Sequence, residues 1–117
     1  TNAILKNSNL INKDLTKTFL YKSDLSGANL SDSDLSLVYL GDTVLKDANL
    51  TKALLYETDL SLALDKDLSG TILNDAQITH SNLVGIDFSG KDLDAVNFYS
   101  SDLTGQDFTN NITFFSI

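Results

Sequence analysis

The chain has 117 residues, no Cys, one His and a formal net charge of −8, because 8 Lys and no Arg stand against 16 acidic residues. The missing Cys excludes disulfides and thiolate metal sites, and the single His excludes multi-histidine metal clusters. The negative charge argues against nonspecific binding to phosphate backbones, and we interpret it as a source of solubility or as a surface for a basic partner.

A period of five organises the chain. Every fifth residue from Leu5 to Leu60 is Leu, and after a step of eight residues a second series of Leu, Ile and Phe runs from Leu68 to Phe108. These large apolar residues argue against disorder, because a disordered chain has no reason to keep such a register. An α-helix also fails, since five residues advance roughly 140° and the side chains would spiral around its axis.

A small residue usually stands two positions before each large one, as Ala28 does before Leu30. This holds for 16 of the 21 units. Residues two apart in an extended segment point to the same side, so each unit turns one small and one large side chain inward. Pairs such as Ser26-Gly27 and Ser69-Gly70 favour turns after the large residues. We therefore expect a chain that turns once per unit and coils around its own core.

Units such as Ser23-Asp24-Leu25-Ser26-Gly27 resemble the motif of the pentapeptide-repeat family, which is a small residue, Asp or Asn, Leu or Phe, and two variable positions. Asp or Asn precedes 14 of the 21 large residues. The resemblance implies an all-β fold, the right-handed quadrilateral β-helix of a pentapeptide-repeat solenoid, with four units per coil and about five coils. Residues 20 apart should then stack, and Asn9, Asn29 and Asn49 should form a ladder of hydrogen-bonded amides.

We expect one pentapeptide-repeat domain over residues 1–117, with a frame-shifting insertion near 61–67 and an apolar cap or tail at 109–117. The insertion is the expected protruding loop, and it either bulges from the coil or resets it. The tail could cap the core, form a homodimer contact at the C-terminal end or lead to a further segment. Because the chain begins at Thr1, we expect an excised domain or a processed product.

Four inward positions carry long polar side chains, namely Lys13, Lys66, Lys91 and Gln106. Burying such a side chain without a hydrogen-bond partner costs free energy. We therefore expect these side chains to reach outward to solvent, or the chain to bulge at these positions.

Exposed aromatic residues form the first candidate site. Phe19 and Tyr39 stand 20 residues apart where Asp or Asn is usual, Tyr21 lies beside them, and Leu54 and Tyr56 fall on the preceding face. A contiguous exposed apolar patch marks a contact site more often than a single exposed ring does. We predict that these residues bind a partner protein. The alternative is that the rings pack against each other and only stiffen the rod.

Asp67, Asp87 and Asp107 recur at intervals of 20 and form a second candidate site. An exposed acidic column could imitate a phosphate backbone. Some pentapeptide-repeat proteins that protect DNA gyrase from quinolones are acidic β-helical dimers that imitate duplex DNA, so the resemblance makes this column relevant. The alternative is that each Asp caps a local turn.

No catalytic, cofactor-binding or metal-binding pattern is visible in the sequence. It has no phosphate-cradling glycine-rich loop, and its single histidine, His80, falls two residues after a large residue and is expected to be solvated.

We predict a noncatalytic protein-interaction scaffold that does not bind nucleic acid directly. The resemblance adds the expectation that the chain is the repeat domain of a larger bacterial protein, such as an effector secreted into a host cell. The alternative is an acidic DNA mimic that binds DNA gyrase and protects or inhibits it. For the compartment, the sequence leaves two alternatives, namely the cytoplasm and secretion into a host cell.

Overall fold

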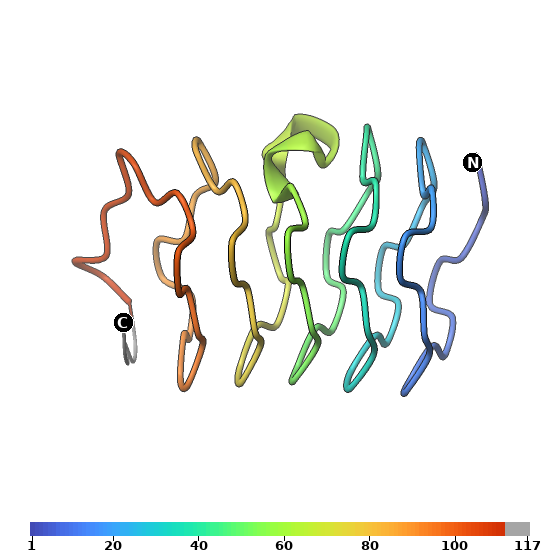
Figure 1. Ribbon diagram of the computed structural model, residues 1–117, viewed down its shortest axis with the longest axis horizontal. Coiled ribbons are helices and arrows are strands. Elements are labelled where there is room, and N and C mark those ends of the chain that lie inside the picture. Colours follow the sequence, from blue (N-terminus) through green and yellow to red (C-terminus); the bar gives the residue numbers. More distant parts are fainter. Residues whose placement is uncertain (112–117) are drawn as a thin grey trace.

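Stacked coils of the chain form a rod, as the computed structural model shows for residues 1–111 (Figure 1). Its principal extents are 35 × 23 × 22 Å. The coils are joined by isolated parallel bridges between single residues, because each unit is extended over only a few residues before the chain turns. The expected cap or dimer contact at 109–117 falls mainly outside the described residues.

Most bridges pair residues 20 apart, as predicted from the sequence, and they define four faces of the rod. Face A carries Ile4, Asp24 and Val44. Face B carries Asn9, Asn29, Asn49 and Ile72. Face C carries Asp14, Asp34, Leu54, Gln77 and Asn97. Face D carries Phe19 with Tyr39, and Asn82 with Asp102.

Two local features turn the chain between faces. The Asp or Asn of a unit accepts a hydrogen bond from the backbone N–H two residues ahead, as from Ser26 to Asp24 Oδ1 at 2.9 Å and from Ser31 to Asn29 Oδ1 at 3.1 Å. The second residue after the large one usually has positive φ, for example 65° at Gly27, where glycine avoids the strain of the left-handed region. Asn9, Asn29 and Asn49 stack as predicted. The predicted hydrogen bonds between their amides are not found among the described residues, and the Oδ1 atom of each accepts from a local backbone N–H instead.

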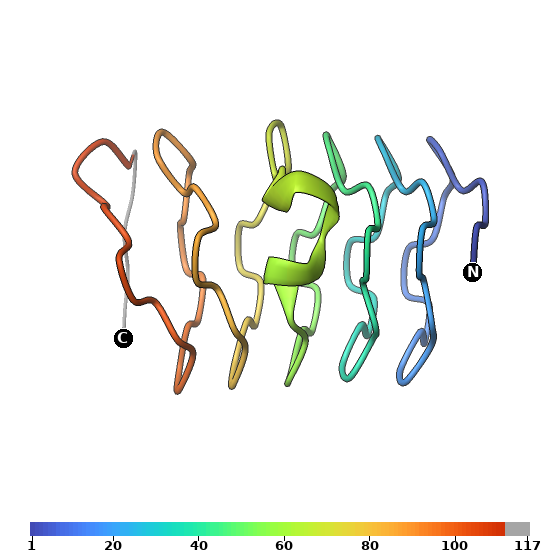
Figure 2. The same ribbon diagram turned by 90° about the horizontal axis from the view of Figure 1, so that it is seen from above.

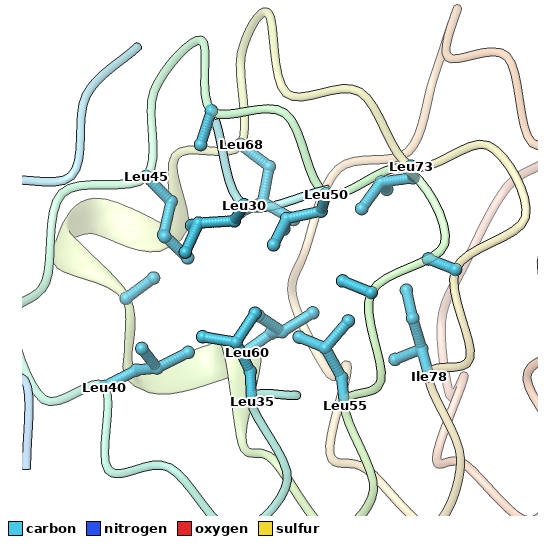
Figure 3. Packing of buried hydrophobic residues seen from close by; sticks show 14 of the residues in the cluster. Leu30, Leu35, Leu40, Leu45, Leu50, Leu55, Leu60, Leu68, Leu73 and Ile78 are labelled. Atoms are coloured by element: carbon cyan, nitrogen blue, oxygen red, sulfur yellow. The ribbon is translucent and has the colours of Figure 1, made fainter. Parts of the chain in front are cut away.

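The core consists of the large residues of opposite faces, which point toward each other across the interior of the coil (Figure 3). Leu25, Leu30 and Leu50 are almost fully buried. The small inward residues let neighbouring coils approach closely enough for backbone hydrogen bonds, and several of their hydroxyls are paired as well. Thr43 Oγ1, for example, donates to the carbonyl of Leu20 in the preceding coil at 2.7 Å.

Lys91 does not follow the predicted outward course. Its side chain is half-buried, and its ammonium group donates to the carbonyls of Leu68 and Thr71. Gln106 behaves similarly and donates through Nε2 to the carbonyl of Leu83 at 3.0 Å. The physical reason is that these carbonyls occupy the positions that Ser and Thr hydroxyls satisfy elsewhere, so each long side chain finds a partner inside the rod.

The insertion forms two short 3₁₀ helices, η1 (Leu60–Leu62) and η2 (Leu64–Lys66), which bulge from one side of the rod (Figure 1) and are seen face-on over its middle in Figure 2. Asp59 caps η1 by accepting from the Ser61 N–H at 2.9 Å. The bridge spacing is 23 residues across the insertion, from Asn49 to Ile72, and returns to 20 from Gln77 to Asn97. The coil therefore continues in register, with the extra residues looped out.

Truncation of a buried Leu should destabilise the whole rod. Leu50→Ala should lower the free energy of unfolding by about 2–5 kcal/mol, because it removes buried methyl groups and leaves a cavity. Ile4→Ala is the control, because Ile4 is 87% exposed and its truncation should cost no more than about 0.5 kcal/mol. Urea unfolding followed by circular dichroism measures both. Equal losses would contradict this assignment of the core.

Candidate interaction surface

Phe19, Tyr21 and Tyr39 form an aromatic cluster on face D and its edge toward face A. The ring centroid of Tyr39 lies 6.0 Å from that of Phe19 and 6.3 Å from that of Tyr21. All three side chains remain open to solvent, with exposed fractions of 68% for Phe19, 36% for Tyr21 and 42% for Tyr39. The ammonium of Lys22 lies 5.1 Å from the Tyr21 ring centroid, within the range of a cation–π contact.

Gly41 sets the position of the Tyr39 ring. A Cβ atom at Gly41 would lie 2.7 Å from a carbon of that ring, so any other residue would displace it. Gly41 is itself buried. The ring therefore lies over the backbone at Gly41, two residues further along its own coil, and stays partly open to solvent.

A second aromatic cluster lies at the corner between faces C and D. The ring of His80 stands between two tyrosines, with its centroid 5.0 Å from that of Tyr56 and 5.6 Å from that of Tyr99. His80 is exposed, as predicted, although it contacts these two rings as well as solvent. The three residues form a continuous column along the corner.

Leu37 extends this column toward the first cluster. Its backbone N–H donates to the carbonyl of Tyr56 at 2.9 Å, and its side chain is exposed. Its φ angle is 59°, as is usual at this position of the repeat. Because its side chain is exposed, it adds apolar area to this corner.

The two clusters and Leu37 all lie on face D or at its edges. We call this set the aromatic surface, and its members are Phe19, Tyr21, Leu37, Tyr39, Tyr56, His80 and Tyr99.

The structure brings together only part of the predicted aromatic site. Phe19, Tyr21 and Tyr39 contact one another, whereas Tyr56 contacts His80. Leu54 is exposed on face C, where its backbone pairs with Asp34 and Gln77.

The partners of Tyr56 were not predicted from the sequence. The position of Tyr99 in the same column could have been predicted. Tyr56 and Tyr99 each directly follow a large residue, and their separation of 43 residues equals one regular coil of 20 and one expanded coil of 23. His80 and Leu37 occupy a different position of the repeat, so their proximity to Tyr56 depends on how the side chains pack at the corner.

The acidic column consists of exposed carboxylates that cap turns. The Oδ1 atoms of Asp67, Asp87 and Asp107 each accept from the backbone N–H two residues ahead, at 2.8, 2.9 and 2.9 Å. Hydrogen bonds from Ser69 are the main reason that the pKa of Asp67 lies below its usual value, and Lys46 and Lys91 lower it further. The turn-capping role is therefore real, and lysines lie near the column.

Metal-binding clusters and membrane-spanning helices are both absent from the described part of the chain. Within residues 1–111, no group of three or more His, Cys, Asp or Glu side chains could hold a metal ion. No helix over the same residues is long and apolar enough to cross a membrane.

The family model of pentapeptide repeats matches eight copies, over residues 1–32, 33–63 and 71–110. The chain belongs to the pentapeptide-repeat family. The family's fold is a right-handed quadrilateral β-helix, which agrees with the four faces described above. No curated protein shows a significant match to the chain.

Solved pentapeptide-repeat proteins cover nearly all of this family member. HetL, involved in heterocyst differentiation regulation in the cyanobacterium Nostoc sp. strain PCC 7120, is 25% identical with a TM-score of 0.41, covering 97% of this chain and 63% of HetL. Rfr23 from the cyanobacterium Cyanothece 51142 is 26% identical with a TM-score of 0.30, and the match covers 95% of this chain and 60% of Rfr23. A pentapeptide-repeat protein from the Arabidopsis thaliana thylakoid lumen is 22% identical with a TM-score of 0.30, and the match covers 97% of this chain and 70% of that protein. The chain thus spans less than two thirds of HetL and Rfr23.

The turn-capping carboxylates should make this pentapeptide-repeat rod sensitive to acid. Hydrogen bonds from the residue two positions ahead are the main reason that the pKa values of six carboxyls lie below the usual 3.8, namely those of Asp14, Asp24, Asp67, Asp87, Asp102 and Asp107. A lowered folded-state pKa stabilises the fold above the unfolded value, and this stabilisation is lost as the pH falls through the lowered values. The melting temperature should therefore be nearly constant from neutral pH to about pH 5 and should fall below about pH 4.

Asparagine provides a matched control for this acid sensitivity. Asn29 and Asn49 cap the same turn without a titrating group, through hydrogen bonds from Ser31 and Thr51. Replacing the six Asp by Asn should preserve folding at neutral pH and flatten the acid limb of the melting curve, measured by circular dichroism. An unchanged acid limb would show that other groups control the transition.

Proposed function

We propose that this protein is a noncatalytic interaction scaffold that binds a partner protein through the aromatic surface. The observation that carries the proposal is the gathering of exposed rings on one side of a rigid rod, at positions where this repeat usually has Asp or Asn or a turn residue. Aromatic side chains are enriched in the buried centres of protein interfaces. A contiguous apolar patch on a soluble protein is itself a sign of a contact site.

The core shows how this repeat packs rings that serve stability alone. Phe88 is 1% exposed, and its ring contacts Phe98 and Phe108 inside the rod. Phe19 and Tyr99, in contrast, are 68% and 61% exposed. Contacts between surface rings contribute only about 0.5–1.5 kcal/mol each and leave apolar area in water, which a bound partner would cover.

The setting that we propose is the repeat domain of a larger bacterial protein, such as an effector secreted into a host cell. Support for this setting comes from membership of the pentapeptide-repeat family and from the rod form, which can hold a neighbouring segment at a defined place. The scaffold role does not depend on it, because the aromatic surface is complete within the described residues.

Tyr39→Asp should abolish partner binding without harming the fold. Asp is the usual residue at this position of the repeat, as at Asp59, so the variant should melt within a few degrees of the wild type. Ile4→Asp on face A is the control, since Ile4 is also exposed, at 87%, and occupies the same position of its unit, where Asp24 stands in the next coil. Proteins captured by the wild type and by Ile4→Asp but lost with Tyr39→Asp are identified by mass spectrometry.

The affinity of the identified partner is then measured with each purified variant. We expect Tyr39→Asp to weaken it at least about tenfold and Ile4→Asp to leave it within about twofold. Unchanged affinity in both Tyr39→Asp and Tyr99→Asp would refute the proposed role of the aromatic surface.

The alternative proposal is an acidic DNA mimic that binds DNA gyrase. Its support is the exposed column of Asp67, Asp87 and Asp107, which recurs once per coil on face A. The nearby Lys46 and Lys91 weaken such a mimic, because they reduce the negative field around Asp67.

Gyrase supercoiling tests this alternative. We expect no inhibition, and no protection from a quinolone, over a wide range of protein concentrations. Inhibition that weakens with added salt and disappears when the three Asp are replaced by Asn would instead favour the DNA mimic.

A further inference from the structure

A groove of about 820 Å³ opens between two coils at the corner of faces A and B. One wall is formed by residues 65–72 and the other by residues 87–92. Its volume lies within the range of ligand-binding pockets in proteins. The corner is diagonally opposite the column of Tyr56, His80 and Tyr99, because the chain passes through faces A, B, C and D in order.

The groove marks an interruption of the backbone hydrogen bonds between the coils. Earlier at this corner, the N–H of Leu25 donates to the carbonyl of Val44 and the N–H of Gly27 to the carbonyl of Lys46, both at 2.9 Å. Among the described residues, no backbone hydrogen bond crosses from 68–70 to 87–89. The amides of Leu68 and Gly70, on one wall, therefore have no partner within residues 1–111.

The opposite wall carries the matching acceptors. By analogy with the earlier coils, the carbonyls of Asp87 and Ser89 should accept from Leu68 and Gly70, and no described residue donates to them. The two walls thus present two unpaired amides and two unpaired carbonyls, and such backbone groups can pair with a further extended segment.

The inward residues explain why the coils separate here. On face A the buried inward position holds the small Ser23 and Thr43 in the coils that are hydrogen-bonded, and it holds the larger Ile86 beside the groove. Lys66, at the same position in the coil between them, is exposed in η2. On face B, Lys91 occupies the position that Ala28 and Ala48 occupy earlier in the chain. An oversized side chain in a tightly packed layer forces the backbones apart.

Faces C and D provide the internal comparison. Their inward residues remain small beyond the insertion, as with Ser81 and Ser101 on face D. The bridges from Gln77 to Asn97 and from Asn82 to Asp102 persist there. The coils are therefore held together on one side of the rod and separated on the other.

The walls of the groove carry more negative than positive charge. Asp65, Asp67, Asp87 and Asp92 line it together with two lysines, Lys66 and Lys91. The Lys91 ammonium already donates to two carbonyls, and burial holds its pKa below the usual value, opposed by Asp67 and Asp87. Lys66 also donates to a backbone carbonyl, that of Val84, at 3.3 Å. The groove therefore complements a positively charged ligand.

We propose that this groove binds an extended basic peptide segment of a partner protein. The peptide backbone pairs with the free amides and carbonyls of the two walls, and its Lys or Arg side chains meet the carboxylates of Asp67 and Asp87. The site is additional to the aromatic surface and does not depend on it, so one rod presents two different contacts at opposite corners.

Binding of a fluorescein-labelled peptide of alternating Val and Arg, followed by fluorescence anisotropy, tests this proposal. We expect the Asp67→Asn, Asp87→Asn double variant to bind about tenfold more weakly than the wild type, since Asn keeps each turn but removes the charge. The Asp14→Asn, Asp34→Asn double variant on face C is the control. It makes the same change in net charge at two carboxylates that cap the same kind of turn, and it should bind within about twofold of the wild type.

A second probe separates strand pairing from attraction between charges. The same peptide methylated on alternate backbone nitrogens keeps its charge but cannot pair through those N–H groups, so we expect its binding to the wild type to be lost. Equal weakening in both double variants, or undiminished binding of the methylated peptide, would overturn the proposal. Tyr39→Asp should bind the peptide normally, which separates a failure of this site from a failure of the aromatic surface.

Discussion

The structure depends on close stacking of each coil on the next, which requires a small side chain beside a large one in the interior of every unit. The large residue fills the core, and the small residue allows neighbouring backbones to approach to hydrogen-bonding distance. Thr43 has two roles here, because its side chain is small enough to fit between coils and its hydroxyl donates to the Leu20 carbonyl. Once this condition is met, the outward residues can vary without disturbing the stacking, so the rod can present different binding surfaces.

The two proposed sites arise from two kinds of departure from this rule. Outward departures leave the backbone unchanged, so Phe19 and Tyr39 replace an Asp or Asn and simply add rings to face D. Inward departures change the backbone, because Ile86 and Lys91 accompany the loss of hydrogen bonds on faces A and B. The first kind makes a surface, and the second makes a groove. The insertion at η1 and η2 belongs to neither, since its extra residues loop out and the register resumes beyond them.

The sequence could predict those contacts in the candidate sites that join residues 20 positions apart. Phe19 and Tyr39 could be paired from the sequence because a regular coil lies between them, and their rings do meet. The contact of Tyr56 with His80 could not be derived in the same way, because the two residues occupy different positions of the repeat and lie across the insertion. The outward course expected for Lys91 was wrong because a sequence does not show which carbonyls lack a partner.

The sequence alone determined the repeat, its family, the inward and outward positions of each unit and the stacking of residues 20 apart. These properties follow from a strict local period, and each unit carries the same information for its own turn. Only the tertiary structure decided that the insertion bulges without shifting the coil, that Tyr56, His80 and Tyr99 form one column, and that a groove opens between residues 65–72 and 87–92. These features depend on how adjacent coils fit together, and that fit depends on packing between residues 18 to 26 positions apart, which no single unit encodes.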